Sequence, residues 1–206
     1  MVMQIHLGEL RKIDYTKAIQ FAIEGMHFHW YLDNKFLLNL YGRYFLYLEL
    51  MRATQVIAAY YGEELAGVLL CEIKGEPKLF RSFWKSVYVK AFDFLQNLFV
   101  KDGVGLYDQA NKEMFKEYNL HHSPNGEIIF LAANPSIKIK GIGSMLLAEL
   151  ERRECGKEVY LYTDNACTYQ FYEHRGFELV QSKDVALKIG NRTVPLQCLL
   201  YRKILG

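Results

Sequence analysis

The stretch EIIFLAANPSIKIKGIGSMLLAELE, residues 127–151, decides the fold that the sequence predicts. Four apolar residues at 128–131 predict a short buried strand. Asn134 and Pro135 predict a turn, and the apolar spacing after Gly141 predicts a helix. The order is therefore strand, basic glycine-containing loop, helix.

The start of that helix has the chemistry of an anion site. The first N–H groups of a helix lack intrahelical acceptors and lie at the positive end of its dipole. Gly141 and Gly143 let a ligand approach the backbone closely, and Lys138 and Lys140 add positive charge nearby. The loop therefore predicts binding of a nucleotide pyrophosphate.

The spacing of this loop selects among nucleotide motifs. The dinucleotide fingerprint G-x-G-x-x-G fails because its third position is Leu146, and the G-K-[ST] of a P-loop is absent. The pattern P-x-x-[R/Q]-x-x-G-x-G fits at Pro135, Lys138, Gly141 and Gly143, with lysine in place of arginine or glutamine. This pattern resembles the acetyl-coenzyme A motif of the GNAT superfamily of N-acetyltransferases.

A second stretch, EVYLYTDNACTYQFYEHRGF at 158–177, carries the same resemblance independently. It is similar to the GNAT signature N-x-x-A-x-x-[LF]-Y-E-x-x-G-F, with Asn165 and Tyr172 at the expected spacing and Thr168 in place of the alanine. Two matches in the right order are far more specific than one. We therefore identify the chain as a GNAT member from its sequence.

The resemblance implies an α/β (α+β) fold whose mixed central sheet is splayed between its fourth and fifth strands. We expect a single domain over residues 1–206, with a two-helix insertion at about 75–125 before the fourth strand. The hairpin at 55–73 would supply the second and third strands, and 177–205 a C-terminal hairpin.

Composition bounds the function. Half of the 206 residues are hydrophobic, and a quarter are charged, which is ordinary for a globular protein. A formal net charge of +2 gives no reason to expect a nucleic-acid partner. The 15 tyrosines and 13 phenylalanines predict aromatic clusters in a core, pocket or interface.

Four cysteines without C-x-x-C pairing predict free thiols in a reducing compartment and no metal site. The N-terminus lacks the layout of a signal peptide, and no run reaches the roughly 18 apolar residues of a membrane span. The sequence therefore predicts a cytoplasmic protein.

The N-terminal part predicts a strand at 3–7 and two helices, one beginning at the N-cap Asp14 and one at about 35–51. By resemblance, the loop between the helices would flank the acceptor pocket. That places near the substrate the residues His27, His29, Trp30, Tyr31 and Tyr41.

The insertion predicts helices over 77–100 and 105–120. The first would present a broad apolar face. The insert would serve as a lid or as a contact in a homodimer, and a membrane surface is the less favoured alternative. The expected apolar face consists of Leu79, Phe80, Phe83, Val87, Phe92, Phe94, Leu95 and Phe99.

Acetyl transfer to an amine needs a proton acceptor, a polarised carbonyl and relief of charge on the thiolate. Glu127 resembles the glutamate that is the general base in the histone-acetyltransferase branch, with a water chain as the alternative. Tyr172 would be the general acid, because the family tyrosine points at the coenzyme sulfur.

The backbone would do the rest, again by resemblance. The Leu131 N–H would polarise the thioester carbonyl, and Leu131, Ala132 and Ala133 would pair with the pantetheine arm like an added strand. Asn165 would contact the same arm. The pyrophosphate would be held by Lys138, Ile139, Lys140, Gly141, Ile142, Gly143 and Ser144.

Two main function classes stay open at this point, beside a third possibility, membrane-associated acylation with a longer acyl chain, that would use the aromatic helix. The first is transfer of an acetyl group from acetyl-CoA to a primary amine of a small molecule or protein, by direct attack in a ternary complex. The second is a GNAT-fold module that binds acyl-CoA as a sensor or partner without turnover. Retention of Glu127 and Tyr172 favours the enzyme.

Overall fold

The computed structural model describes residues 4–30, 32, 34–80, 82–99, 104–189 and 192–206. Side chains are described in these ranges except at 93–99, 104, 188–189 and 192. The expectation for Tyr31 therefore lies outside the described residues, as do those for the side chains of Phe94, Leu95 and Phe99.

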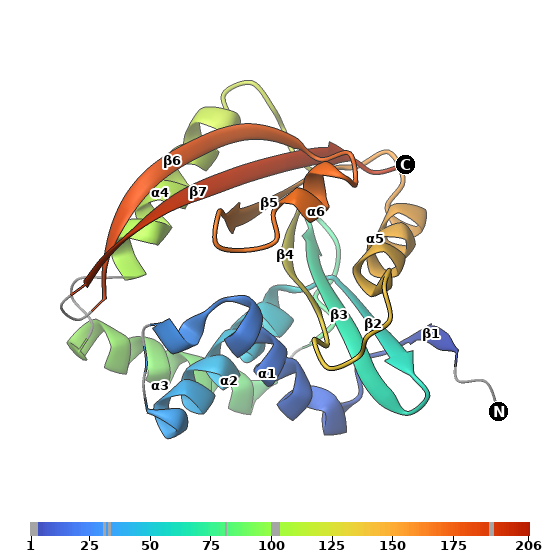
Figure 1. Ribbon diagram of the computed structural model, residues 1–206, viewed down its shortest axis with the longest axis horizontal. Coiled ribbons are helices and arrows are strands. Elements are labelled where there is room, and N and C mark those ends of the chain that lie inside the picture. Colours follow the sequence, from blue (N-terminus) through green and yellow to red (C-terminus); the bar gives the residue numbers. More distant parts are fainter. Residues whose placement is uncertain (1–3, 31, 33, 81, 100–103, 190–191) are drawn as a thin grey trace.

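One mixed sheet forms the centre of the described chain (Figure 1). Its strand order is β1-β2-β3-β4-β5-β7-β6. Neighbours are antiparallel except for β4 and β5, which are parallel. The strands are β1 Ile5–Gly8, β2 Gln55–Tyr61, β3 Glu64–Ile73, β4 Gly126–Ala133, β5 Glu158–Asp164, β6 Glu178–Ile189 and β7 Arg192–Ile204.

Helices cover both faces of this sheet (Figure 1). Short 3-10 turns precede α1 at Lys12–Asp14 and follow it at Phe28–Trp30. The α-helices are α1 Tyr15–Gly25, α2 Lys35–Arg52, α3 Phe83–Phe99, α4 Val104–Tyr118, α5 Ile142–Arg153 and α6 Gln170–Glu173.

Three buried clusters show how the layers pack. The first joins α1 and α2 to β2–β4 and includes Leu46, Leu50 and Phe130. The second joins α5 to the opposite face of β2–β5 and β7. The third packs α4 on the face of β5 and β7 that α5 does not cover, through Met114 and Leu200. On one face, therefore, α1–α2 cover the first half of the sheet and α4 covers the second half.

The sheet opens between β4 and β5. These strands pair only at their starts, Gly126 with Val159 and Glu127 with Tyr160. A β-bulge causes β4 to bend, because Leu70 pairs with Phe130 and Cys71 with Ile128, which leaves Ile129 as the extra residue. The edge of β4 beyond Glu127 therefore carries backbone groups without a β5 partner. This confirms the splayed α/β fold predicted from the sequence.

The two-helix insertion is present, and the residues of its expected apolar face divide between two sides of the first helix. Tyr88 and Phe92 of α3 pack on α2, and Val89 is buried. Phe83 and Val87, which belonged to the predicted apolar face, are 75% and 42% exposed. The helix repeat explains this, because Tyr88, Val89 and Phe92 share one side of α3 and Phe83 and Val87 share another.

The role of Asp14 also differs from the prediction. It occupies the N-cap position of α1, but its side chain makes no capping hydrogen bond. Its carboxylate instead accepts hydrogen bonds from the Arg11 guanidinium at 2.7 Å and the Tyr60 hydroxyl at 3.0 Å. Tertiary partners thus replace the local one.

The helices in the described ranges include none with the length and hydropathy that a membrane span requires.

Gly126 offers a test of the point where β3, β4 and β5 meet. In Gly126→Ala the new Cβ would meet the Glu72 carbonyl and lie 2.6 Å from Cδ1 of Ile73. We expect the free energy of unfolding to fall by about 1–3 kcal/mol in urea denaturation. Gly105→Ala is the control, because nothing lies within 4 Å of its Cβ position. An equal loss in both variants would contradict the crowding described at Gly126.

Candidate functional site

Asn134 fixes the path of the chain as it leaves β4. It is 3% exposed, and its N–H donates to the Ala66 carbonyl at 2.7 Å. Its side chain accepts from the Ser136 N–H at 2.9 Å, an Asx turn, and donates to a Glu64 carboxylate oxygen at 3.1 Å. The loop therefore leaves the sheet in one fixed direction, toward the start of α5.

The N-terminus of α5 is built as the sequence predicted. Gly141 holds the N-cap position with φ +93°, a left-handed conformation that favours glycine. The first hydrogen bond of the helix runs from the Met145 N–H to the Gly141 carbonyl at 2.9 Å. The preceding N–H groups, those of Ile142, Gly143 and Ser144, project from the helix end.

The two signatures meet at Gly143. A Cβ there would lie 3.1 Å from the Cζ atom of Phe171, which comes from the second signature. Below it, a Cβ on Gly67 of β3 would lie 2.7 Å from Ile142. The helix start is therefore held between β3 and the α6 segment, and only residues without a side chain fit at these contacts.

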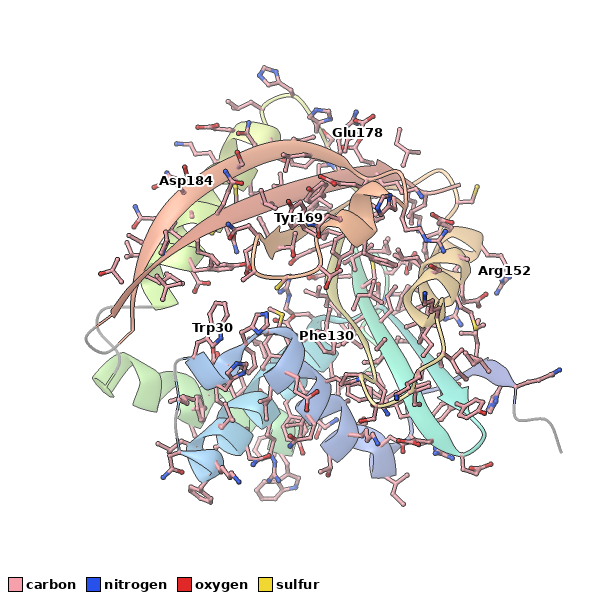
Figure 2. All side chains as sticks on the ribbon, in the orientation of Figure 1. Trp30, Phe130, Arg152, Tyr169, Glu178 and Asp184 are labelled. Carbon is pink, nitrogen blue, oxygen red and sulfur yellow. The ribbon has the colours of Figure 1, made fainter. Side chains whose placement is uncertain are left out.

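A cavity of about 1610 Å³ begins at this helix end and follows β4 inward. Its volume exceeds the roughly 300–1,000 Å³ of ordinary ligand pockets, so it has room for more than one substrate. Phe130 and Trp30 lie toward the α1–α2 side of the molecule and Tyr169 toward the α6 side (Figure 2).

Most residues predicted for the site line this cavity. They are Leu131, Ala132, Ala133, Ile139, Gly141, Ile142, Gly143, Ser144 and Tyr172, together with His27 and Tyr41. The residues placed outside its lining are Glu127, Lys138, Lys140, Asn165, His29 and Trp30.

Asn165 faces away from the cavity for a clear reason. Its side-chain oxygen accepts the Gln197 N–H at 3.0 Å, and its own N–H donates to the Gln197 carbonyl at 3.1 Å. The residue thus extends the pairing of β5 with β7. Ala166, Cys167 and Thr168, which follow it, line the cavity instead.

Tyr172 enters the cavity wall beneath the helix start. Its ring packs edge-on against Phe171 and Phe177, with centroids 5.3 and 5.6 Å away. Burial raises the pKa of its hydroxyl well above the usual value, and the neighbouring Cys167 adds to this. Among the described residues its hydroxyl has no hydrogen-bond partner, so the protonated phenol is available as a donor to a ligand.

Cys167 is the other reactive side chain at this wall. Burial raises the pKa of its thiol to about 12, with Asp164 as the next cause. The thiol is therefore protonated near neutral pH and has little nucleophilic character. Asp164 accepts hydrogen bonds from the N–H groups of Ala166 and Cys167 and from the Tyr107 hydroxyl. It thereby ties helix α4 to the end of β5.

The loop after α1 closes the cavity from the other side. A ring nitrogen of His27 lies 3.3 Å from the Ala166 carbonyl, and the Cys167 thiol lies 3.6 Å from the Gly25 carbonyl. The His27 ring also stacks on Trp30 with centroids 4.6 Å apart. These contacts connect the α1–α2 half to the β5 half across the open sheet.

A cluster of three carboxylates around one arginine lies at the start of β4. Arg52 contacts Glu127 at 2.6 Å, Glu49 at 3.1 Å and Glu72 at 3.1 Å. Glu127 also accepts a hydrogen bond from the Tyr160 hydroxyl at 3.1 Å. Glu49 is the member of this cluster that lines the cavity.

The environment of Glu49 is unusual for a carboxylate. The side chain is 7% exposed, and burial raises its pKa to about 7. The negative charges of Glu127 and Glu72 act in the same direction, while Arg52 opposes them. Nothing in the sequence marks Glu49, because a glutamate in an aromatic helix belongs to no local motif.

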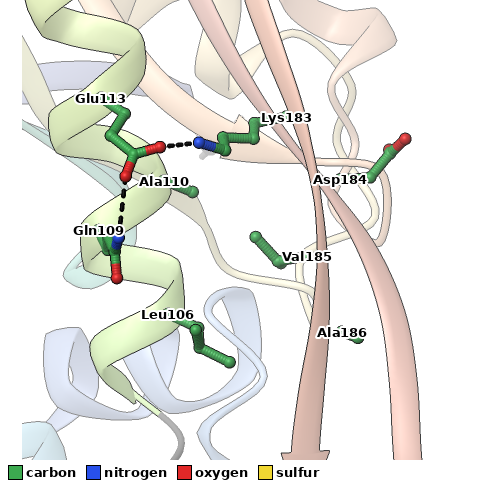
Figure 3. Close-up of a pocket in the computed structure, with 8 residues that line it drawn as sticks. All are labelled: Leu106, Gln109, Ala110, Glu113, Lys183, Asp184, Val185 and Ala186. Atoms are coloured by element: carbon green, nitrogen blue, oxygen red, sulfur yellow. Dashed lines mark hydrogen bonds and ion pairs between the residues drawn. The ribbon is translucent and has the colours of Figure 1, made fainter.

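A smaller cavity of about 350 Å³ lies between α4 and β6 (Figure 3). Two of its charged groups are paired, since Lys183 contacts Glu113, and Gln109 donates to the same carboxylate at 2.9 Å. Elsewhere in the described ranges, no group of three or more histidine, cysteine, aspartate or glutamate residues is arranged to hold a metal ion.

Comparison with known proteins agrees with this geometry. Residues 103–177 match the model of the acetyltransferase (GNAT) family. This match covers 75 of the 206 residues, so the chain is similar to that family over this segment. No curated protein matches the sequence.

Solved structures share the fold. PH1933 of Pyrococcus horikoshii is 16% identical, with a TM-score of 0.57 over 97% of this chain and 99% of its own. The PaiA N-acetyltransferase of Thermoplasma acidophilum, solved with coenzyme A, is 16% identical, with 0.53 over 98% and 99%. YncA of Salmonella typhimurium, solved with acetyl-CoA, is 14% identical, with 0.51 over 98% and 94%. At these identities the likeness establishes the fold alone.

Asn134 offers a test of how the loop is held. Asn134→Ala removes one acceptor and two donors from a buried position, so we expect the free energy of unfolding to fall by about 1–3 kcal/mol. Asn165→Ala is the matched control, because Asn165 is exposed and accepts a single hydrogen bond. Urea denaturation of both variants measures the difference. A larger loss in the Asn165 variant would contradict this account of the loop.

Proposed function

We propose that this protein transfers an acetyl group from acetyl-CoA to a primary amine, by direct attack in a ternary complex. One observation carries the proposal. The open edge of β4, the projecting N–H groups of α5 and the Tyr172 hydroxyl belong to a single cavity. Acetyl-CoA needs these three features, one for its pantetheine arm, one for its pyrophosphate and one for its sulfur.

The residues present fit the coenzyme. The N–H groups of Ile142, Gly143 and Ser144 are placed to donate to the pyrophosphate, and Gly141 and Gly143 keep the approach clear. Lys138 and Lys140 lie on the same loop and add positive charge. The pantetheine arm would lie along Leu131 to Ala133, in the place that β5 leaves open. That acetyl-CoA and coenzyme A are bound by proteins of this fold supports the assignment.

The direction in which the coenzyme would lie along β4 sets where each reacting group would lie. With the pyrophosphate at α5 and the arm running from Ala133 to Leu131, the thioester carbonyl reaches the Leu131 N–H. That N–H would stabilise the oxyanion formed when the amine attacks. The acceptor must then enter from the part of the cavity beyond Leu131, toward the start of β4.

Tyr172 would supply the proton that the departing thiolate needs. Collapse of the tetrahedral intermediate breaks the carbon–sulfur bond, and the phenol donates its proton to the sulfur. The attacking nitrogen gives up a proton in turn, which restores the phenol. A phenol whose pKa is raised by burial stays protonated until the thiolate forms.

The base role that the sequence suggested for Glu127 stays a prediction. Its Oε2 atom already accepts from Arg52 and from Tyr160, and the residue does not line the cavity. Its position therefore gives it no direct path to the amine. The dimer contact expected of the insertion likewise stays a prediction.

Glycines at the two ends of α5 test the coenzyme site. Gly141→Ala and Gly156→Ala both place a side chain at positive φ with no atom within 4 Å of the new Cβ. Backbone strain should cost each about 1–2 kcal/mol of stability. Calorimetry with coenzyme A should show roughly tenfold weaker binding in Gly141→Ala alone, because only that end of the helix meets the pyrophosphate. Unchanged affinity in Gly141→Ala would place the coenzyme elsewhere.

Tyr172→Phe tests the general acid. We expect kcat to fall by at least about 100-fold while coenzyme A affinity stays within twofold, because the hydroxyl acts on the leaving group. Tyr169→Phe is the matched control, since Tyr169 is a neighbouring tyrosine that does not line the cavity. Coenzyme A binding without transfer to any amine in the unmodified protein would favour the non-catalytic acyl-CoA-binding module instead.

A further inference from the structure

The cavity continues past the thioester position into a chamber whose lining from α2 and α3 the sequence predicted only at Tyr41. We define this acceptor chamber by six lining residues from α2 and α3, namely Tyr41, Tyr44, Phe45, Glu49, Tyr88 and Phe92. Five of the six are aromatic. The chamber is therefore a product of the insertion, which brings α3 against α2.

The aromatic rings form a continuous wall. The rings of Tyr44 and Phe92 stack with centroids 4.6 Å apart and an interplanar angle of 20°. Tyr41 and Tyr88 lie 6.0 and 6.3 Å from the same Phe92 ring. A wall of this kind favours a flat apolar group, which gains both buried area and ring contacts.

The charges of the cavity have one sign. Glu24, Glu49, Asp108 and Asp164 line it. Over the ranges that the structure describes, no lysine or arginine does. A cavity with carboxylates and without basic side chains favours a cationic acceptor over an anionic one.

The position of Glu49 on α2 brings it beside the first half of β4. Phe45, one helical turn before it on α2, contacts Phe130 of β4 with ring centroids 5.6 Å apart. Through Arg52, one turn further along, the same helix face contacts Glu127. Glu49 therefore lies beside β4 between Phe130 and Glu127, on the acceptor side of Leu131.

We propose that the acceptor chamber binds a cationic primary amine with a flat apolar body, and that Glu49 takes the proton of its ammonium group. The inference rests on the proposed acetyl transfer and deepens it. The aromatic wall receives the body of the amine, and Glu49 receives its charge.

Glu49 and Tyr172 together account for every proton that moves in the reaction. The ammonium transfers one proton to a Glu49 oxygen, and the freed nitrogen lone pair forms the bond to the thioester carbon. The carbon–sulfur bond then breaks, and the second nitrogen proton replaces the one that Tyr172 gives to sulfur. Glu49 finally releases its proton to water, so the net products are the amide, the thiol and one proton.

The ionisation of Glu49 suits this role near neutral pH. Burial raises its pKa to about 7, which makes it a stronger base than an exposed carboxylate. The charged groups that act on it are Arg52 on α2, Glu72 on β3 and Glu127 on β4, and Lys78 pairs with Glu72. On β5, Tyr160 donates to Glu127, and Tyr162 lies near Glu127 and Arg52.

Glu49→Gln is the decisive variant, assayed by thiol release from acetyl-CoA with 2-phenylethylamine. In the unmodified protein we expect kcat/KM to fall below about pH 7, as Glu49 becomes protonated. The variant should lose at least about 100-fold in kcat and lose that acidic limb, while coenzyme A affinity stays within twofold.

Glu72→Gln is the control, because Glu72 contacts the same arginine and does not line the cavity. Its negative charge raises the pKa of Glu49. Its loss should therefore move the acidic limb to lower pH and leave the plateau rate unchanged. A merely structural role for Glu49 predicts no such shift.

Phe92→Ala tests the aromatic wall separately. We expect KM for 2-phenylethylamine to rise about tenfold. KM for ethylamine should stay within twofold, because ethylamine has no ring that could contact Phe92. In the unmodified protein, kcat/KM should be higher for 2-phenylethylamine than for spermidine, which is cationic but has no flat body.

The outcomes separate this inference from the proposed function. Failure to bind coenzyme A, or to acetylate any amine, overturns both. Acetylation that keeps its rate and pH profile in Glu49→Gln overturns the role of Glu49 and leaves acetyl transfer standing. A kcat/KM for spermidine at or above that for 2-phenylethylamine overturns the acceptor class alone.

Discussion

The structure depends on the failure of β4 to stay paired with β5. Two residue pairs hold the strands together at their starts, and beyond them the bulge at Ile129 turns β4 away. An unpaired strand edge in the middle of a sheet is costly unless something pairs with it. The cavity follows this edge to the start of α5, so the backbone groups that β5 leaves free lie in the same space as the N–H groups of the helix. One local irregularity thus creates both the place for a ligand and the groups that bind it.

Where the sheet opens, its two halves lose the hydrogen bonds that would join them. Packing of helices on one face of the sheet replaces those contacts. Helices α1 and α2 pack on the β2–β4 half, and α4 of the insertion packs on the β5–β7 half. Tyr107 joins α4 to Asp164 at the end of β5, and His27 reaches from the α1–α2 loop to the Ala166 carbonyl. The insertion therefore belongs to the wall of the cavity, and α3 adds aromatic rings that a shorter chain would lack. This is why the character of the acceptor chamber follows from residues outside both signatures.

The sequence predicted what depends on local chemistry. The glycine loop and the helix start follow from short patterns that fix backbone conformation, as the left-handed φ of Gly141 illustrates, whereas the open sheet was expected only from the resemblance to the GNAT superfamily. The sequence did not predict the hydrogen bonds of side chains whose partners come from distant elements. The Asp14 carboxylate accepts a hydrogen bond from the Tyr60 hydroxyl, 46 residues away, and the Asn165 side chain accepts one from the Gln197 N–H of β7. The sequence left open which residues of the apolar face of α3 would pack, and Phe92 does so whereas Phe83 does not, because a broad apolar face does not reveal which side will meet a partner.

The acidic cluster shows why position in a strand does not by itself define a base. Glu127 and Glu49 share Arg52, yet their surroundings differ. The Oε2 atom of Glu127 accepts from both Arg52 and Tyr160, whereas Glu49 has Arg52 at a longer 3.1 Å and faces the cavity. A buried carboxylate with incomplete compensation is destabilising, and its raised pKa expresses that cost. Arg52 and Lys78 supply two positive charges against three carboxylates, so the charge of the cluster balances when one carboxylate is protonated. Glu49 is the member of the cluster whose pKa is raised and the one that meets the cavity, so the cluster places a carboxylate that can exchange a proton near neutral pH beside the acceptor chamber.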